Sequence, residues 1–139
     1  MKSIFLVVIL SLFVISNSAQ EKQESVPVVQ QISIPMYPVL AIHLGLQEGI
    51  KVSLKINREG KVVSTSFNRG DKNFHTVIKE ALQQWSFEES SENERNVDFT
   101  FIFTLVPADS KSFITSVIKL PNTIEVFAKR VKIINTIDR

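Results

Sequence analysis

The clearest pattern in the chain is an amphipathic segment at residues 74–87, FHTVIKEALQQWSF. Its apolar residues recur three and four positions apart, the spacing that places side chains on one face of an α-helix, and polar residues fill the other face. The apolar face consists of Phe74, Val77, Ile78, Ala81, Leu82 and Trp85. A helix with one apolar face needs a sheet to cover it, so the pattern predicts strands before and after it.

Alternation of apolar and polar residues predicts those strands. Residues 50–56 and 61–67 are joined by a turn that ends in Gly60, which is typical of a β-hairpin. Residues 97–106 alternate most strongly, and one face of this strand consists of Val97, Phe99, Phe101, Phe103 and Leu105. Aromatic side chains bury the largest areas, so we expect the centre of the core between this face and Trp85.

A short helix is predicted ahead of the hairpin, beginning at Pro38 and ending near Gly45. Two helical turns are not stable alone, so we expect Tyr37 and Leu44 to anchor the helix to the core. The sequence therefore predicts an α+β fold, a small antiparallel sheet with two helices packed on one face, in the order helix–strand–strand–helix–strand. The residues expected in the core are Leu54, Ile56, Phe74, Val77, Ala81, Trp85 and Phe101.

The chain beyond residue 106 is rich in β-branched residues and predicts a C-terminal β extension over residues 107–139. A turn at residues 107–111 would lay residues 113–120 against the free edge of the 97–106 strand. A covered edge cannot accept a strand from another protein, so binding would then move to the new outermost strand or to another surface. The other possibility is that the 97–106 edge stays open.

The N-terminus has the features of a secretory signal peptide at residues 1–19. Lys2 precedes an apolar run at residues 4–15, and small residues lead to a cleavage site after Ala19. The run is shorter than the ~20 residues that span a bilayer. We therefore expect a periplasmic or secreted protein, with membrane contact only if this segment is retained, and a single domain at residues 35–106 behind a flexible lead at residues 20–34.

Composition and motifs argue against catalysis and against metal or nucleic-acid binding. Positive and negative charges nearly balance, so no basic field attracts nucleic acid, and the absence of cysteine removes thiol chemistry and Cys-type zinc sites. His43 and His75 have no companions at metal-ligand spacing, and the acidic loop at residues 88–94 lacks the order of a calcium loop. We expect no enzyme activity, no cofactor and no metal. The alternative is a small hydrolase that uses Ser116 and Lys119 as an S-x-x-K pair.

A set of residues between positions 37 and 106 resembles the C-terminal domain of the TonB energy-transducer family. The matching residues are Tyr37-Pro38, Ala41, Leu44, Glu48-Gly49, Val52, Leu54, Ile56, Gly60, Val62, Phe74, Val77, Ala81 and Trp85-Ser86-Phe87-Glu88. The resemblance implies a bacterial periplasmic domain that grips a peptide of an outer-membrane transporter by adding it to the last strand of its sheet, which is β-augmentation. The chain departs from the family at Gln83, Gln84, Ser86 and Glu89, where the family tends to carry arginines and a closing proline.

The resemblance implies that the partner-binding surface is the last strand of the domain. The residues expected to bind are Tyr37, Val97, Asp98, Phe99, Thr100, Phe101, Ile102, Phe103 and Thr104. The partner would be an envelope protein or peptide with a role in transmembrane transport, or a second copy of this chain. The alternative is an accessory or structural envelope domain whose own tail caps the sheet edge, with no energy-transducing role.

Overall fold

The computed structural model describes residues 27–111, 114–119 and 121–132. The predicted signal peptide and the first part of the predicted lead lie outside these residues. The elements are β1 (Val29–Gln31), α1 (Val39–Leu44), β2 (Glu48–Asn57), β3 (Val62–Phe67), α2 (Lys72–Leu82), β4 (Ser86–Phe87), β5 (Glu94–Val106), β6 (Ser116–Lys119) and β7 (Thr123–Lys129). None of the helices in the described part of the chain is long and apolar enough to cross a membrane.

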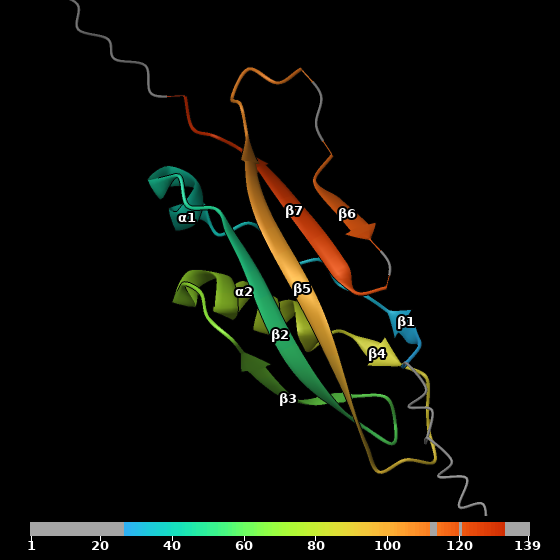
Figure 1. Ribbon diagram of the computed structural model, residues 1–139. Helices are drawn as coiled ribbons and strands as arrows, with labels where there is room; N and C mark the ends of the chain where they lie inside the picture. Colours follow the sequence, from blue (N-terminus) through green and yellow to red (C-terminus); the bar gives the residue numbers. More distant parts are fainter. Residues whose placement is uncertain (1–26, 112–113, 120, 133–139) are drawn as a thin grey trace, which may run out of the picture.

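The fold is α+β, as predicted, with two helices beside a mostly antiparallel sheet (Figure 1). The sheet has five strands in the order β3-β2-β5-β7-β6, and β5 with β7 is its one parallel pair. The predicted hairpin is β2 and β3, which pair from Val52 with Phe67 to Ile56 with Val62. The predicted order helix–strand–strand–helix–strand is therefore present as α1, β2, β3, α2 and β5.

The core fills one face of the sheet. Alternate residues of β2 and β5 point into it, and the other face carries exposed polar side chains such as Lys51 and Ser53. Trp85 and Phe99 meet edge to face with ring centres 4.9 Å apart, and Phe74 and Phe103 lie 4.6 Å apart. Among the residues expected in the core, Leu54, Ile56, Phe74, Ala81, Trp85 and Phe101 are buried, and Val77 is partly buried. The aromatic side chains of β5 and the end of α2 thus form the centre of the core.

Helix α2 ends earlier than its apolar spacing predicts. It begins behind Asp71, whose carboxylate accepts the Asn73 N–H at 2.8 Å, and it ends at Leu82. Trp85 lies beyond it in a turn, and its indole N–H donates to the carbonyl of Ser33 at 2.8 Å. The following two residues form β4 instead of a last helical turn, because the Phe87 N–H donates to the carbonyl of Gly60 at 2.8 Å.

Part of the segment predicted as a flexible lead is ordered against the domain. β1 pairs with β4, with Val29 opposite Phe87 and Gln31 opposite Ser86. Ile32 and Ile34 pack against the core. These contacts explain the order, because β4 supplies hydrogen bonds that the lead cannot make within itself.

Two glycines with positive φ differ in how closely the chain surrounds them. Gly45 (φ 67°) ends α1 in open space, whereas Gly60 (φ 77°) lies against the backbone of Phe87, where a Cβ would collide. We expect Gly60→Ala to lower the free energy of unfolding by more than about 2 kcal/mol, since it adds a clash to the ~1–2 kcal/mol cost of a left-handed non-glycine residue. Gly45→Ala, the matched control, should cost only about 1 kcal/mol. Equal losses in chemical denaturation would contradict this account.

Candidate functional site

Both edges of β5 are paired within the chain. On one side β2 pairs along it from Glu48 opposite Phe103 to Asn57 opposite Glu94. On the other side β7 runs parallel to it, from Thr100 opposite Thr123 to Val106 opposite Lys129. The strand edge that the family resemblance implies for partner binding is therefore covered over residues 100–106 (Figure 1).

The strand that covers β5 is not the one expected. Residues 113–120 were predicted to lie there, but β6 lies one position further out and pairs antiparallel with β7. The residues that the two strands turn toward the core fit this strand order: β7 presents Ile124, Val126 and Ala128 there, whereas β6 presents Ser116 and Ile118. Ile124 and Val126 of β7 are 1% and 3% exposed on the core face, whereas Ile118 of β6 is 52% exposed. The strand with the more apolar core face takes the inner position.

Hydrogen bonds hold β7 in place at both of its ends. Asn122 donates its side-chain N–H to the carbonyl of Asp98 (2.6 Å) and accepts the Thr100 N–H at its own carbonyl (2.9 Å). At the other end the Arg130 N–H donates to the carbonyl of Val106 at 2.9 Å. The cover thus extends over residues 98–106 of β5.

The residues expected to bind a partner are not gathered into one free surface. Phe99, Phe101 and Phe103 are buried in the core. Asp98 is half-exposed on the polar face, where Lys51 and Ser53 donate to its carboxylate at 2.7 Å each and hold the pKa of that carboxyl below its usual range. The remaining expected residues of this strand, Val97, Thr100, Ile102 and Thr104, are partly buried between neighbouring strands.

Tyr37 is a core residue in this fold. Its ring lies edge to face with Phe103 at 5.4 Å, and its hydroxyl donates to the carbonyl of Leu46 at 2.6 Å. Burial raises the pKa of Tyr37 to about 12, and the positive charge of Arg130 opposes this only in part.

Because Tyr37 is the only tyrosine in the chain, its titration can be followed directly by ultraviolet absorbance. The pKa of Tyr37 is higher in the folded state than the ordinary value of about 10, so the folded state binds more protons between these values. We expect a phenolate midpoint near pH 12 in the native protein and a loss of stability as the pH rises from about 10 to 12. In denaturant the midpoint should return to about 10. A native midpoint near 10 would show that the phenol is solvated.

Because β7 contributes to the core, a truncation can test whether the domain folds without residues 107–139. Removal of residues 107–139 would expose Phe101 and Phe103 at the edge of the sheet and delete Ile124 and Val126 from the core. Each buried Ile or Val lost costs about 1–5 kcal/mol, which is comparable to the whole stability of a small domain. We expect the truncated chain to lose its cooperative thermal transition. A truncated domain that melts cooperatively would show that the tail is dispensable.

With β5 covered, β3 and β6 form the outer edges of the described sheet. In the hairpin of β2 and β3, hydrogen-bonded and non-hydrogen-bonded residue pairs alternate. The Asn68 N–H donates to the carbonyl of Lys51 at 3.1 Å, and this bond shows which pairs are hydrogen-bonded. Ser64 and Ser66 direct their backbone groups toward β2, and Thr65 and Phe67 direct theirs outward. Within residues 27–111, 114–119 and 121–132, only the start of this edge is occupied, by a bridge between Lys61 and Ser86.

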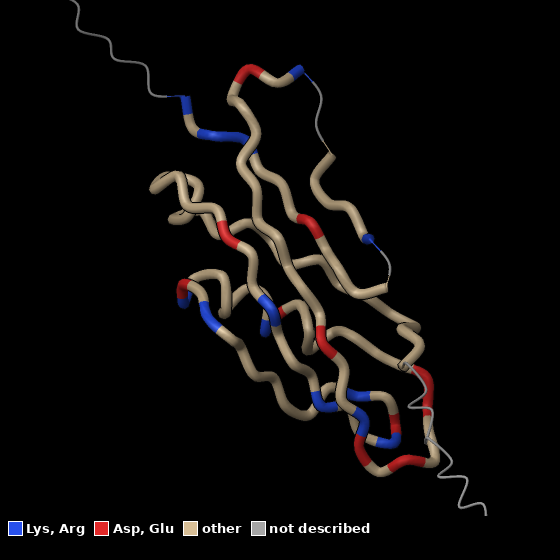
Figure 2. The backbone as a smooth tube through the Cα atoms, in the orientation of Figure 1, with Lys and Arg blue, Asp and Glu red and all other residues tan. Residues whose placement is uncertain are grey.

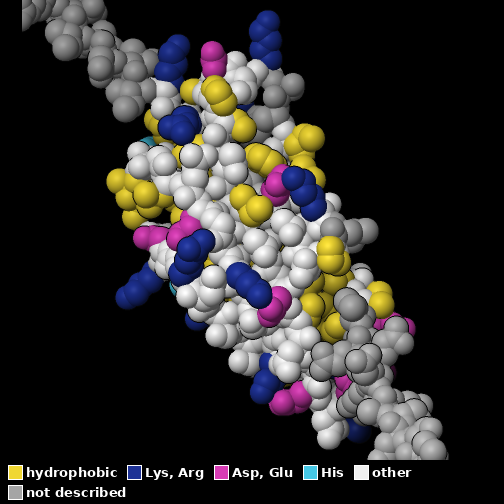
Figure 3. Space-filling model, in the orientation of Figure 1, with side chains coloured by type: hydrophobic (Ala, Val, Ile, Leu, Met, Phe, Trp, Pro, Cys, Tyr) yellow, Lys and Arg dark blue, Asp and Glu magenta, His cyan; other side chains and the backbone are white. Residues whose placement is uncertain are grey.

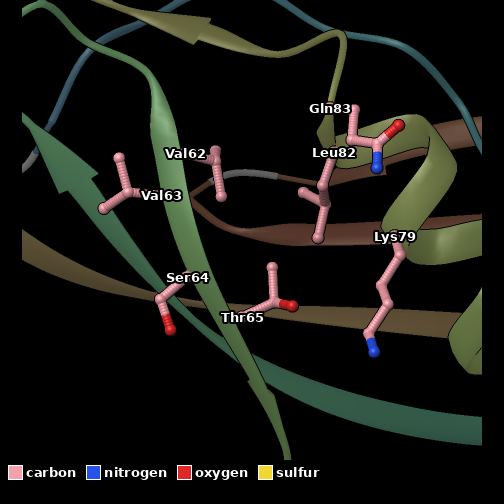
Figure 4. A pocket seen from close by; sticks show the side chains of 7 residues that line it. All are labelled: Val62, Val63, Ser64, Thr65, Lys79, Leu82 and Gln83. Carbon is pink, nitrogen blue, oxygen red and sulfur yellow. The ribbon is translucent and has the colours of Figure 1, made fainter.

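A hollow of about 250 Å³ lies between the open part of β3 and α2 (Figure 4). It is lined by Val62, Val63, Ser64, Thr65, Lys79, Leu82 and Gln83. The Lys79 ammonium lies 5.6 Å from the centre of the Phe67 ring, and that ring stacks on His75 at 4.2 Å. The site therefore offers unpaired backbone, apolar side chains and one positive charge beside a groove. A signal for it exists in the sequence, since VVSTSF at residues 62–67 contains no charged residue (Figure 2) and no proline that could protect an edge.

The residues considered for catalysis and metal binding do not form a site. Ser116 and Lys119 are three positions apart in a strand, so their side chains point to opposite faces, and the Lys119 ammonium pairs with Glu125 at 2.7 Å. The His75 Nε2 lies 2.8 Å from the carbonyl of Arg69. In the part of the chain that the structure describes, no group of His, Asp and Glu side chains could hold a metal ion.

No protein-family model matches the chain, and a comparison with curated proteins gives no match. Among solved structures, the solution NMR structure of the Pseudomonas aeruginosa TonB C-terminal domain is similar to it. The two are 19% identical with a TM-score of 0.47, and the match covers 60% of this chain and 88% of the TonB domain.

Proposed function

We propose that this protein is a periplasmic protein-interaction module that binds an extended segment of an envelope protein, such as an outer-membrane transporter, by strand addition at the outer edge of β3. The observation that carries the proposal is the free backbone at Thr65 and Phe67 beside the hollow that α2 borders. Backbone hydrogen bonds would supply affinity, and alternate side chains of the bound strand would enter the hollow and supply selectivity.

The surroundings of β3 define the chemistry of the partner. Thr65 and Phe67 face the helix side of the sheet, so every second side chain of an added strand would also lie on that side. There the floor is apolar at Val62 and Leu82, and Lys79 is the one charged residue in the lining. An extended segment with alternating apolar residues and an acidic residue placed to meet Lys79 fits this surface best.

A second candidate function is that of an accessory or structural envelope domain that does not capture a peptide at β5. The observation in its favour is the cover that β7 places on β5, with Ile124 and Val126 buried in the core. In this function the tail takes the position of a bound strand permanently, with no energy-transducing role.

A proline at position 65 separates the two functions. The Thr65 N–H points away from β2, so Thr65→Pro removes a donor from the open edge and leaves the bonds between β2 and β3 in place. We expect peptides selected from a displayed random library to bind the wild-type protein and Thr65→Val alike, and to bind Thr65→Pro at least about tenfold more weakly.

Calorimetric titration gives the affinities, and thermal melting shows that Thr65→Pro is folded. Amide hydrogen exchange provides an independent measurement, since bound peptide should slow exchange at Thr65 and Phe67. Equal binding to Thr65→Pro, or failure to select any peptide, would refute strand addition at β3 and favour the structural function.

A further inference from the structure

Among the residues that the structure describes, none pairs with the outer edge of β6, which therefore presents unpaired backbone at defined positions. The Phe127 N–H donates to the carbonyl of Thr115 at 2.9 Å, and β6 pairs with β7 from Ser116 opposite Val126 to Lys119 opposite Thr123. Hydrogen-bonded pairs alternate in an antiparallel ladder, so Val117 and Lys119 bond to β7. The N–H and C=O groups of Ser116 and Ile118 therefore point away from the sheet.

Apolar side chains accompany this edge. Ile118 shares the core side of the sheet with its neighbour Ile124 but is 52% exposed, and Ile114 is 67% exposed just ahead of the strand. A hollow of about 200 Å³ lies beside Ile118, and six of its nine lining residues are apolar: Val29, Ile32, Phe99, Ile118, Pro121 and Ile124. Figure 3 shows hydrophobic side chains along this side of the molecule. The core layer thus continues to an edge where nothing in the described chain covers it.

The charge on this edge is neutralised within the chain. Lys119 is the one charged residue of β6, and its ammonium pairs with the Glu125 carboxylate at 2.7 Å. The edge therefore does not select an acidic or a basic partner, unlike the outer edge of β3 with Lys79. It fits a partner strand that is neutral and β-branched, and β6 itself has these properties.

We propose that two copies of the protein associate through their β6 strands, which pair antiparallel about a two-fold axis at Ser116 and join the two sheets into one. In this register Ile114 lies opposite Ile118 of the second copy on the core side, and Thr115 lies opposite Val117 on the polar side. A two-fold axis forms each pair twice, so four exposed isoleucines are covered. The two copies of Lys119 are then six residues apart, about 20 Å.

Two other registers also pair the outward-facing backbone of β6, and both are worse. With the axis at Val117, Ile118 of each copy would face Ser116 of the other copy instead of an isoleucine, and the two copies of Lys119 would be four residues apart, about 13 Å. With the axis at Ile118, each Lys119 would face Val117 of the other copy, and the two ammonium groups would lie only two residues apart along the strands, about 7 Å. Like charges at that separation repel, and an apolar side chain would meet a cation. The axis at Ser116 follows from this comparison. The proposal concerns a different edge from the one assigned to the partner protein, so both surfaces can be occupied at once.

Because the chain has no cysteine, single cysteine variants can test the axis directly. Two copies of Ser116 opposite each other in a hydrogen-bonded pair have Cα atoms about 5.5 Å apart, within the range of a disulfide. We expect Ser116→Cys to form a disulfide-linked dimer under mild oxidation. Ser64→Cys, on an exposed serine of the opposite edge strand β3, is the matched control and should crosslink at least about tenfold more slowly.

Light scattering of the uncrosslinked protein completes the test. The wild-type protein should show a concentration-dependent dimer, and Ser116→Pro and Ile118→Glu should be monomers with native circular dichroism. Ser116→Pro removes only an outward N–H, and Ile118→Glu places a carboxylate on each side of the axis. Thr65→Pro should remain dimeric, which separates this proposal from the function proposed for β3. A wild-type monomer up to about 1 mM, or equal crosslinking of Ser116→Cys and Ser64→Cys, would overturn it.

Discussion

The structure depends on hydrogen bonding of β5 along both of its edges. This strand contributes Phe99, Phe101 and Phe103 to the core, and it can do so because β2 and β7 pair with the backbone that carries them. A strand with bulky apolar side chains and a bare edge is a template for aggregation. In this chain the later strand β7 removes that risk, and the open backbone of the sheet moves to the less apolar strands β3 and β6.

Much of the fold follows from the sequence, because two periodicities are unusually clear. The alternation at residues 50–56 and 97–106 predicts β2 and β5, and the helical stripe from Phe74 to Leu82 predicts α2 and the face that it buries. The end of α2 could not be predicted from spacing, since Trp85 continues the stripe. Its position is decided by the carbonyls of Ser33 and Gly60, which lie far away in the sequence. Long-range bonds of this kind also explain β1, whose residues show no period.

The candidate site was harder to predict, because it depends on which of two similar segments lies next to β5. Both β6 and β7 are rich in β-branched residues, and consecutive strands are usually neighbours, which favours β6. The deciding property is a contrast between the core faces of the two strands, Ile124 and Val126 against Ser116 and Ile118. This contrast is found only when the core-facing residues of β6 and β7 are compared with each other. The same contrast leaves the expected binding residues of β5 inside the sheet and gives the edge strands their accessible backbone.

The strand order has a consequence for how the molecule is completed. β7 follows β6 in the chain but lies inside it in the sheet, so the outermost strand is synthesised before the strand that connects it to β5. Until β7 has been synthesised, β5 of the nascent chain carries three phenylalanines and has one unpaired edge. Chaperones bind intermediates of this kind. A chain that ends before residue 123 would never acquire β7, so one edge of β5 would stay unpaired.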